Sequence, residues 1–286
     1  MLRFILKILV ALILITIGYN IDESLRPEFI GGGYILIITI LIIDGFNFFY
    51  KNRNRLKLTL HSFWIGLFGK YIRFSMSYQY VIKVNDKYLL VQNANPNWNW
   101  YQHVGGKYKR LPETQSVLKE MNATDDLKMK TAGLKNGDLA VFVPARNAMK
   151  FLDWFNSEKN REISHWREFY EELLGEKADN RILKKKNFPY VNYRFLKSVQ
   201  TPLKRAPIES GWDCWEILQY DVLELIPNKS QQKELEELLF KGDSEYIKWA
   251  SAQMINKLGY DEGELGTKYN IGPHAKWVLN LKWSKT

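Results

Sequence analysis

The chain has 286 residues, of which 46% are hydrophobic and 14% aromatic, so it carries enough apolar surface for a folded core and is not a disordered protein. Its single cysteine, Cys214, excludes an internal disulfide framework and a cysteine-based zinc site. The formal net charge of +10 favours anionic partners, either nucleotides or a membrane surface.

Two apolar runs, at about residues 4–21 and 31–50, open the chain. Each approaches the ~20 residues that a helix needs to cross the hydrocarbon core. Basic residues flank the pair on its outer ends, while the link between the runs is acidic. Basic flanks stay on the cytoplasmic side of a membrane. We therefore predict a transmembrane helical hairpin over residues 1–57 with both termini in the cytoplasm. The second run argues against a cleaved signal peptide.

Asp44 lies inside the second apolar run. A carboxylate there either lies near the cytoplasmic headgroups or faces another helix or a water-filled gap in an oligomer. The next segment, residues 58–76, mixes aromatic and basic residues. That composition fits an interfacial juxtamembrane segment as well as it fits a buried first helix or strand of the following domain.

The rest of the chain, residues 77–286, alternates strand-like and helix-like patterns. Period-two alternation around Asn85-Asp86 predicts a β-hairpin, and a loop rich in Asn, Pro and Trp then leads to Gly105-Gly106. We expect strands at 138–145, 192–200 and 214–225 and helices at 147–155, 164–174, 230–242, 244–260 and 272–283. Ser164 is the expected N-cap of the helix at 164–174. The helices at 230–242 and 244–260 each start near Ser and end near Gly. The fold class is α+β, with helices covering a mixed sheet.

Three carboxylates gather in the helix expected at 164–174. Glu168, Glu171 and Glu172 share one face because residues three and four apart are neighbours on a helix. Their mutual repulsion is relieved by a cation, and carboxylate oxygens suit Mg²⁺, with Mn²⁺ as the alternative. Such an ion could clamp phosphate oxygens and orient a water for attack on a phosphoanhydride. The alternative is a solvated helix face without catalytic function.

The order of hairpin, glycine pair and acidic helix resembles the Nudix hydrolases. The stretch 100–109, WYQHVGGKYK, is similar to their glycine-rich loop, and residues 167–172, REFYEE, match their helix. The resemblance implies that Glu168, Glu171 and Glu172 are metal-binding and catalytic, and that Arg167 holds helix and loop together. The fold it implies is a Nudix-like α/β/α domain.

The chain departs from the Nudix pattern at three places. An insertion, residues 110–163, separates loop from helix, and Gly175 stands one position later than expected. The glutamate that the family places between loop and helix has three candidates here, none at the family's spacing: Glu113, Glu158 and Glu162. These departures leave hydrolysis open.

A narrower resemblance covers nearly the whole chain. Two membrane segments followed by a diverged Nudix domain with a long insertion are similar to the SMODS-associated Nudix proteins of CBASS, the bacterial anti-phage systems that signal through cyclic oligonucleotides. The resemblance implies a multi-pass effector in the bacterial inner membrane, which binds a cyclic oligonucleotide or dinucleotide and assembles as a homo-oligomer on activation. No direct DNA or RNA partner is expected.

Two functions follow from this resemblance. The first is an effector whose Nudix-like domain senses the nucleotide and whose membrane segments disrupt the bilayer. The second is a membrane-tethered, Mg²⁺-dependent hydrolase of a nucleoside diphosphate derivative or of the signal itself. For either function, the residues expected to bind the ligand are Trp100, Gly105, Gly106, Lys107, Lys109 and Arg167.

Overall fold

The computed structural model describes residues 2–94, 98–126, 128, 137–175, 181–207 and 211–279, without the side chains of residues 2–5, 41, 44 and 48. The chain divides into two compact units, residues 1–64 and 65–286. We describe each unit separately.

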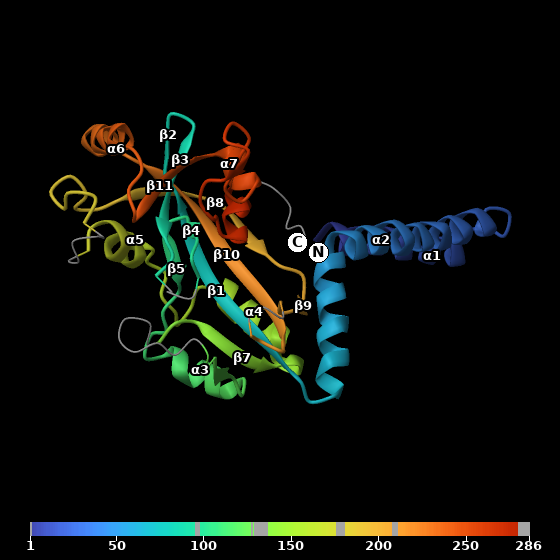
Figure 1. Ribbon diagram of the computed structural model, residues 1–286. Helices are drawn as coiled ribbons and strands as arrows, with labels where there is room; N and C mark the ends of the chain where they lie inside the picture. The colour runs from blue at the N-terminus through green and yellow to red at the C-terminus, as the bar shows by residue number, and fades with distance from the viewer. Residues whose placement is uncertain are drawn as a thin grey trace. The chain divides into compact units, whose positions relative to one another are not determined.

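The N-terminal unit is a pair of helices, α1 (Leu2–Asn20) and most of α2 (Arg26–Leu67), which run back along each other (Figure 1). Small residues allow this close approach. A Cβ atom on Gly33 would lie 3.0 Å from the carbonyl oxygen of Ala11, and one on Gly18 would lie 2.7 Å from Ile30. The expected helical hairpin is therefore present as a pair of packed helices.

One stretch of this unit, Arg26–Asn47, is long and apolar enough to cross a membrane by length and composition, with a mean hydropathy of 2.1. The apolar part of α1, Leu6–Asn20, is shorter. A hairpin that crosses the membrane twice thus stays a prediction. The helix α2 also differs from the expected boundary, because it continues without a break beyond residue 50 and through the first half of the juxtamembrane segment.

The C-terminal unit is α+β with a mixed sheet, as expected. Its large sheet has the order β6-β7-β1-β10-β8, with β5 paired to β1 and β9 paired to β10. The central strand β1 runs parallel to β10 and antiparallel to β5 and β7, with Tyr78 opposite Asp221 on one side and opposite Gly106 on the other. The strands of this sheet are β1 (Tyr71–Val81), β5 (Gly105–Lys107), β6 (Thr124–Asp125), β7 (Ala140–Pro144), β8 (Asn192–Gln200), β9 (Lys204–Arg205) and β10 (Trp215–Ile226).

A smaller sheet and a two-stranded ribbon complete the β structure. The small sheet consists of β2 (Lys83–Val84), β3 (Lys87–Gln92), β4 (Tyr101–Gln102) and β11 (Ile247–Ser251), and the ribbon of β12 (Tyr260–Asp261) and β13 (Gly266–Thr267). Asn85 and Asp86 connect β2 to β3 with φ values of 44° and 62°, which is the tight turn that a two-residue hairpin needs. The hairpin expected at this pair is confirmed.

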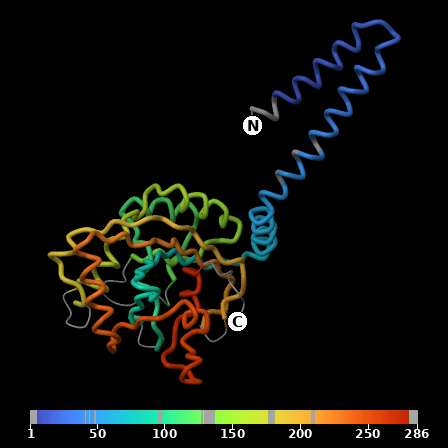
Figure 2. The backbone as a smooth tube through the Cα atoms, turned by 90° about the horizontal axis from the view of Figure 1, so that it is seen from above, coloured from blue at the N-terminus to red at the C-terminus, as the bar shows by residue number. Residues whose placement is uncertain are grey.

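Helices cover one face of the large sheet, and a 3₁₀ segment covers the other. On the first face, Phe74 of β1 meets Phe151 of α4 (ring centroids 4.5 Å apart), and Tyr80 meets Phe169 of α5. On the second face, Tyr220 of β10 packs against Trp277 at 4.6 Å. These elements and the remaining helices are α3 (Thr114–Glu120), η2 (Ala145–Asn147), α4 (Ala148–Asn156), α5 (Trp166–Leu173), α6 (Lys229–Lys241), α7 (Ala252–Asn256) and η5 (Pro273–Leu279). Figure 2 shows the same arrangement turned by 90°.

Three local predictions were wrong. The segment 244–260 is not one helix, because Ile247–Ser251 forms β11 against β3 and only Ala252–Asn256 is helical. The N-cap of α5 is His165 rather than Ser164. The helix α6 does not start at Ser230, because it is capped by Asn228, whose side chain accepts hydrogen bonds from two backbone N–H groups.

Candidate functional site

The site begins at β5, where two glycines let the chain pass close to its neighbours. Gly105 has a φ of 152°, and a Cβ atom there would lie 2.2 Å from the carbonyl oxygen of Tyr78 on β1. A Cβ atom on Gly106 would lie 2.2 Å from the carboxylate of Glu168. Gly105 therefore requires glycine for the strand pairing, whereas at Gly106 the absence of a side chain leaves room for the carboxylate of Glu168 on α5.

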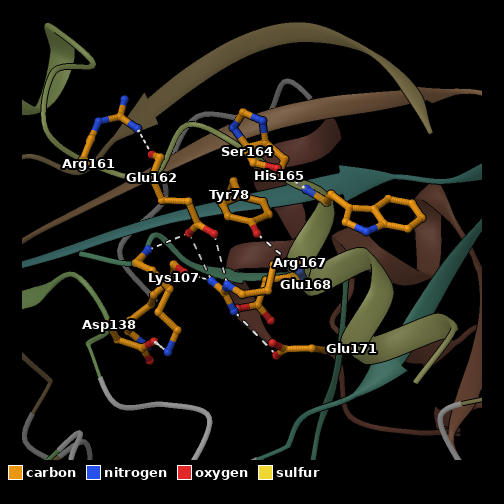
Figure 3. A network of polar contacts seen from close by, with 12 residues as sticks. Tyr78, Lys107, Asp138, Arg161, Glu162, Ser164, His165, Arg167, Glu168 and Glu171 are labelled. Carbon is orange, nitrogen blue, oxygen red and sulfur yellow. Dashed lines mark hydrogen bonds and ion pairs between the residues drawn. The ribbon is translucent and has the colours of Figure 1, made fainter. Parts of the chain in front are cut away.

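The acidic helix α5 docks on this glycine pair through two of its three carboxylates. Glu172 Oε2 accepts a hydrogen bond of 2.8 Å from the backbone N–H of Gly105. The Glu168 carboxylate lies against Gly106, and its own backbone N–H points to the hydroxyl of Tyr78 at 3.4 Å. The fold thus brings loop and helix together in spite of the insertion at 110–163 (Figure 3).

Arg167 ties the two parts together. Its Nη2 donates to the carbonyl oxygen of Lys107 at 2.7 Å, and its Nε donates to Glu162 Oε1 at 3.1 Å. Its Nη1 contacts Glu168 and lies 3.6 Å from Glu171 (Figure 3). One guanidinium therefore contacts three carboxylates and fixes the helix to β5.

Of the three candidates for the glutamate between loop and helix, Glu162 is the one that contacts Arg167. Besides binding Arg167, it accepts the backbone N–H of Lys109 through Oε2 at 2.7 Å. Of the other two candidates, Glu113 is the residue that precedes α3, and Glu158 lies 3.7 Å from Arg161. The sequence could not choose among the three because none has the family's spacing to Arg167, and these contacts favour Glu162.

Burial perturbs two of the carboxyl groups on α5. Burial raises the pKa of Glu168, and Arg167 partly offsets this effect. Burial and the neighbouring Glu168 raise the pKa of Glu172 well above its ordinary value. Glu172 keeps part of its surface in contact with solvent, but its carboxylate is surrounded by protein. Two like charges in such surroundings are stabilised by a bound cation.

The donor chemistry of this helix fits a hard divalent cation. Glu168, Glu171 and Glu172 would hold Mg²⁺ or Mn²⁺, which when bound polarises a phosphoryl oxygen or activates a water. Among the described residues, no group of three acidic, histidine or cysteine side chains is arranged to hold a metal ion. At this helix Arg167 binds Glu168 and lies beside Glu171. Metal binding by the trio stays a prediction.

The other residues expected to bind ligand fall into separate groups. Gly105, Gly106 and Lys107 form β5 beside the carboxylates, whereas the ammonium of Lys109 pairs with Asp138 at 2.6 Å. Trp100 stacks on Trp98 with ring centroids 5.0 Å apart, and it packs beside His274. The backbone of Asp44 belongs to α2, but its side chain lies outside the described residues.

A chain of four polar side chains lies at the N-terminus of α5 and was not expected from the sequence. Tyr108 donates to Asp221 Oδ2 at 2.6 Å, and His165 Nε2 lies 2.8 Å from the same hydroxyl. Burial lowers the pKa of His165 to about 4, so the ring is neutral at pH 7. The single proton of Tyr108 goes to Asp221, so Nε2 carries the ring proton and Nδ1 accepts from Tyr193 at 3.0 Å.

Of these four side chains, only His165 lies next to the motif at residues 167–172 in the sequence. Its partners come from distant elements. Tyr108 follows β5, Tyr193 belongs to the edge strand β8, and Asp221 belongs to β10. These residues do not form a motif of fixed spacing in the sequence. They come together only through the pairing of the strands, so the sequence alone could not predict the group. The His165 carbonyl also accepts the hydroxyl of Tyr80 at 3.0 Å, which fixes the start of α5 on β1.

Comparison with known proteins gives one match. A family model described as SMODS-associated NUDIX domain matches residues 71–279, which is most of the chain. Neither the curated proteins nor the solved structures contain a match to the chain. The matched range begins at the first residue of β1 and ends at the last residue of η5.

Proposed function

The chain belongs to the family of SMODS-associated NUDIX domains, and we propose that it is a membrane-anchored effector of a CBASS anti-phage system. In this proposal the Nudix-like domain senses a cyclic nucleotide, and the N-terminal helices assemble with those of other copies to disrupt the bacterial inner membrane. Both termini lie in the cytoplasm, where the signal is made.

The observation that carries the proposal is the combination of two parts in one chain. The apolar helix α2 leads, within four residues, into β1, the central strand of a domain whose glycine loop and acidic helix are held together by Arg167. The glycine loop and acidic helix, which in this proposal recognise phosphate, thus belong to the same chain as a helix that is apolar over Arg26–Asn47. The formal charge of +10 favours attraction of a polyanionic nucleotide to this frame.

Ligand binding can drive assembly only through differential affinity. A nucleotide shifts the monomers toward the assembled state only if it binds that state better. A cyclic oligonucleotide carries several phosphates, so it could contact basic residues of two copies at once. Homo-oligomerisation on activation follows from this requirement.

The alternative function is a membrane-tethered hydrolase that depends on Mg²⁺ or Mn²⁺. It is favoured by the half-buried side chains of Glu168 and Glu172, whose carboxyl pKa values are raised and would be lowered by a bound cation. The substrate would be a nucleoside diphosphate derivative or the signal nucleotide. In this case the carboxylates are catalytic in the pathway, whereas in the effector proposal binding alone suffices.

One double variant separates the two functions. Glu171→Gln with Glu172→Gln removes two charges while the amide oxygen of residue 172 still accepts from Gly105. Phage protection, nucleotide turnover and calorimetric binding of cyclic di- and trinucleotides are measured on the full chain. The effector proposal expects protection and binding to persist. Loss of protection and turnover with retained binding favours the hydrolase, and a wild-type chain that binds no cyclic nucleotide contradicts the sensor.

A further inference from the structure

The C-terminal part of α2 carries a stripe of exposed apolar side chains. Leu60, Phe63, Trp64 and Leu67 follow the spacing of one helical stripe and are 61%, 56%, 60% and 59% exposed. Phe68, directly after the helix, is 76% exposed. In contrast, Ser62 and Ile65, which lie between these positions on the helix, are buried. The helix is thus amphipathic, but its solvent-facing stripe is the apolar one.

Cations precede this stripe on the same side of the helix. Arg53 and Lys57 stand seven and three residues before Leu60, which are same-face spacings, and both are exposed. Lys51 and Arg55 add two more positive charges, and no acidic residue occurs between Asp44 and Asp86. The segment therefore combines a positive part next to the apolar span with an aromatic and aliphatic part further along.

The direction of α2 changes between these two regions. Figures 1 and 2 both show that the helix bends after its apolar stretch, so that its last turns do not continue along the axis of the candidate span. A helix that leaves a membrane and lies along its surface needs such a bend. Its exposed stripe then faces the boundary between headgroups and acyl chains.

We propose that residues 53–68 form an interfacial segment, helical as far as Leu67, which inserts Leu60, Phe63, Trp64, Leu67 and Phe68 into an anionic membrane surface while Arg53 and Lys57 bind lipid phosphates. A bilayer is favoured over a second copy of the chain because a copy would place two acid-free cationic segments together. Trp and Phe beside Lys and Arg also match the composition of interfacial segments. This inference depends on the membrane anchoring in the proposed function.

The inference gives the membrane a role in positioning the sensor. The helix ends at Leu67, and β1 begins at Tyr71. Only Gly69 and Lys70 therefore lie between the lipid-bound segment, which includes Phe68, and the central strand of the nucleotide-sensing sheet. A change in the depth or orientation of this segment in the membrane would therefore displace the start of β1.

The test uses full-length protein with Cys214 replaced by Ser, reconstituted into vesicles of phosphatidylcholine and phosphatidylglycerol. A fluorescent label is placed at Phe63→Cys, at Ile38→Cys within the candidate span, and at Phe240→Cys, an exposed aromatic position of α6. Quenching is measured with nitroxide-bearing lipids and with aqueous iodide. Tests of Arg53→Gln with Lys57→Gln in the Phe63→Cys background show whether anionic headgroups contribute.

The expected result is that nitroxide lipids quench the label at residue 63 as they quench the label at residue 38. Iodide should quench it several-fold less than the label at residue 240, and the Arg53→Gln, Lys57→Gln pair should weaken this protection. Iodide quenching equal to that at residue 240, or shielding from both quenchers as under a protein partner, overturns the interfacial helix while leaving the anchor intact. If the label at residue 38 is itself not quenched by lipid, the membrane anchor and this inference both fail.

Discussion

Arg167 donates to the carbonyl oxygen of Lys107 over 2.7 Å, and this bond joins the acidic helix α5 to the glycine strand β5. The same guanidinium contacts Glu162, Glu168 and Glu171, with 23% of its surface exposed. A side chain that donates to a carbonyl and contacts three carboxylates at once uses the planar fork of the guanidinium, which a lysine ammonium does not supply. The consequence is that the geometry of the site depends on this one side chain.

Arg167→Met should lower the free energy of unfolding by about 2 kcal/mol, because it leaves partly buried carboxylates without a counter-charge; the partial exposure keeps the loss below that of a fully buried pair. The matched control is Arg194→Met, which removes a surface pair with Glu224 in which the arginine is 67% exposed. That change should stay within about 0.5 kcal/mol. Thermal unfolding of the full chain in detergent micelles measures both. Equal shifts for the two variants would show that Arg167 has no special structural role.

The two glycines of β5 should respond differently to alanine. Gly105→Ala places a Cβ atom 2.2 Å from the backbone of Tyr78 in a backbone conformation that alanine rarely adopts. We expect a loss of stability of about 3 kcal/mol or more, seen as a lower unfolding temperature.

Gly106→Ala meets the end of a flexible side chain instead, since its Cβ atom would displace the carboxylate of Glu168. We expect little loss of stability but weaker Mn²⁺ binding, measured by calorimetry against the wild-type chain. Unchanged Mn²⁺ affinity would argue that Glu168 is not a metal ligand. Unfolding of both variants alike would mean that the second glycine is structural too.

Much of the fold follows from local sequence pattern. The helix α5 and the strands β8 and β10 stand where periodicity places them, because each is long enough for its pattern to be unambiguous. The turn at Asn85-Asp86 is equally local, since both residues tolerate positive φ. These features depend on neighbours in the chain, which the sequence shows directly.

Features set by contacts between distant segments could not be found in this way. The segment containing β11 begins after a serine and ends at a glycine as helices do, yet pairing of Ile247–Ser251 with β3 outweighs that local preference. Glu162 was one of three candidates because the insertion at 110–163 hides the distance between loop and helix. The contacts of Glu162 with Arg167 and Lys109, which favour it over the other two, form only once the chain is folded.

His103 predicts an acid-sensitive domain. The side chain is 2% exposed, and burial, with repulsion from His274, lowers its pKa to about 3. Because the unfolded chain binds this proton near pH 6.5 and the folded chain does not, stability is complete above pH 6.5 and falls as the pH drops toward 3. The slope attributable to the residue is about 1.4 kcal/mol per pH unit.

His103→Leu should flatten the pH dependence of unfolding across this window while leaving its shape above pH 6.5 unchanged. Thermal unfolding of both proteins at closely spaced pH values is the measurement. Parallel curves for wild type and variant would show that His103 takes up its proton in the folded state as readily as in the unfolded one.

The polar chain at the N-terminus of α5 gives the last prediction. Tyr108 is 1% exposed and is the donor to Asp221, whereas Tyr193 at the other end of the chain is 40% exposed. Tyr108→Phe leaves a buried carboxylate and the His165 N–H without their partner, so it should cost about 2 kcal/mol. Tyr193→Phe removes a hydroxyl that water can replace, and it should cost less than about 0.5 kcal/mol.

The two substitutions delete the same atom, so comparison of their unfolding temperatures isolates the effect of burial. The ring resonances of His165, followed by NMR with ¹⁵N-labelled histidine, give a second readout. Tyr108→Phe should remove the acceptor of the Nε2 proton and shift its signal, while Tyr193→Phe should affect Nδ1 instead. A wild-type spectrum with the proton on Nδ1 would contradict the hydrogen-bond directions derived from the geometry.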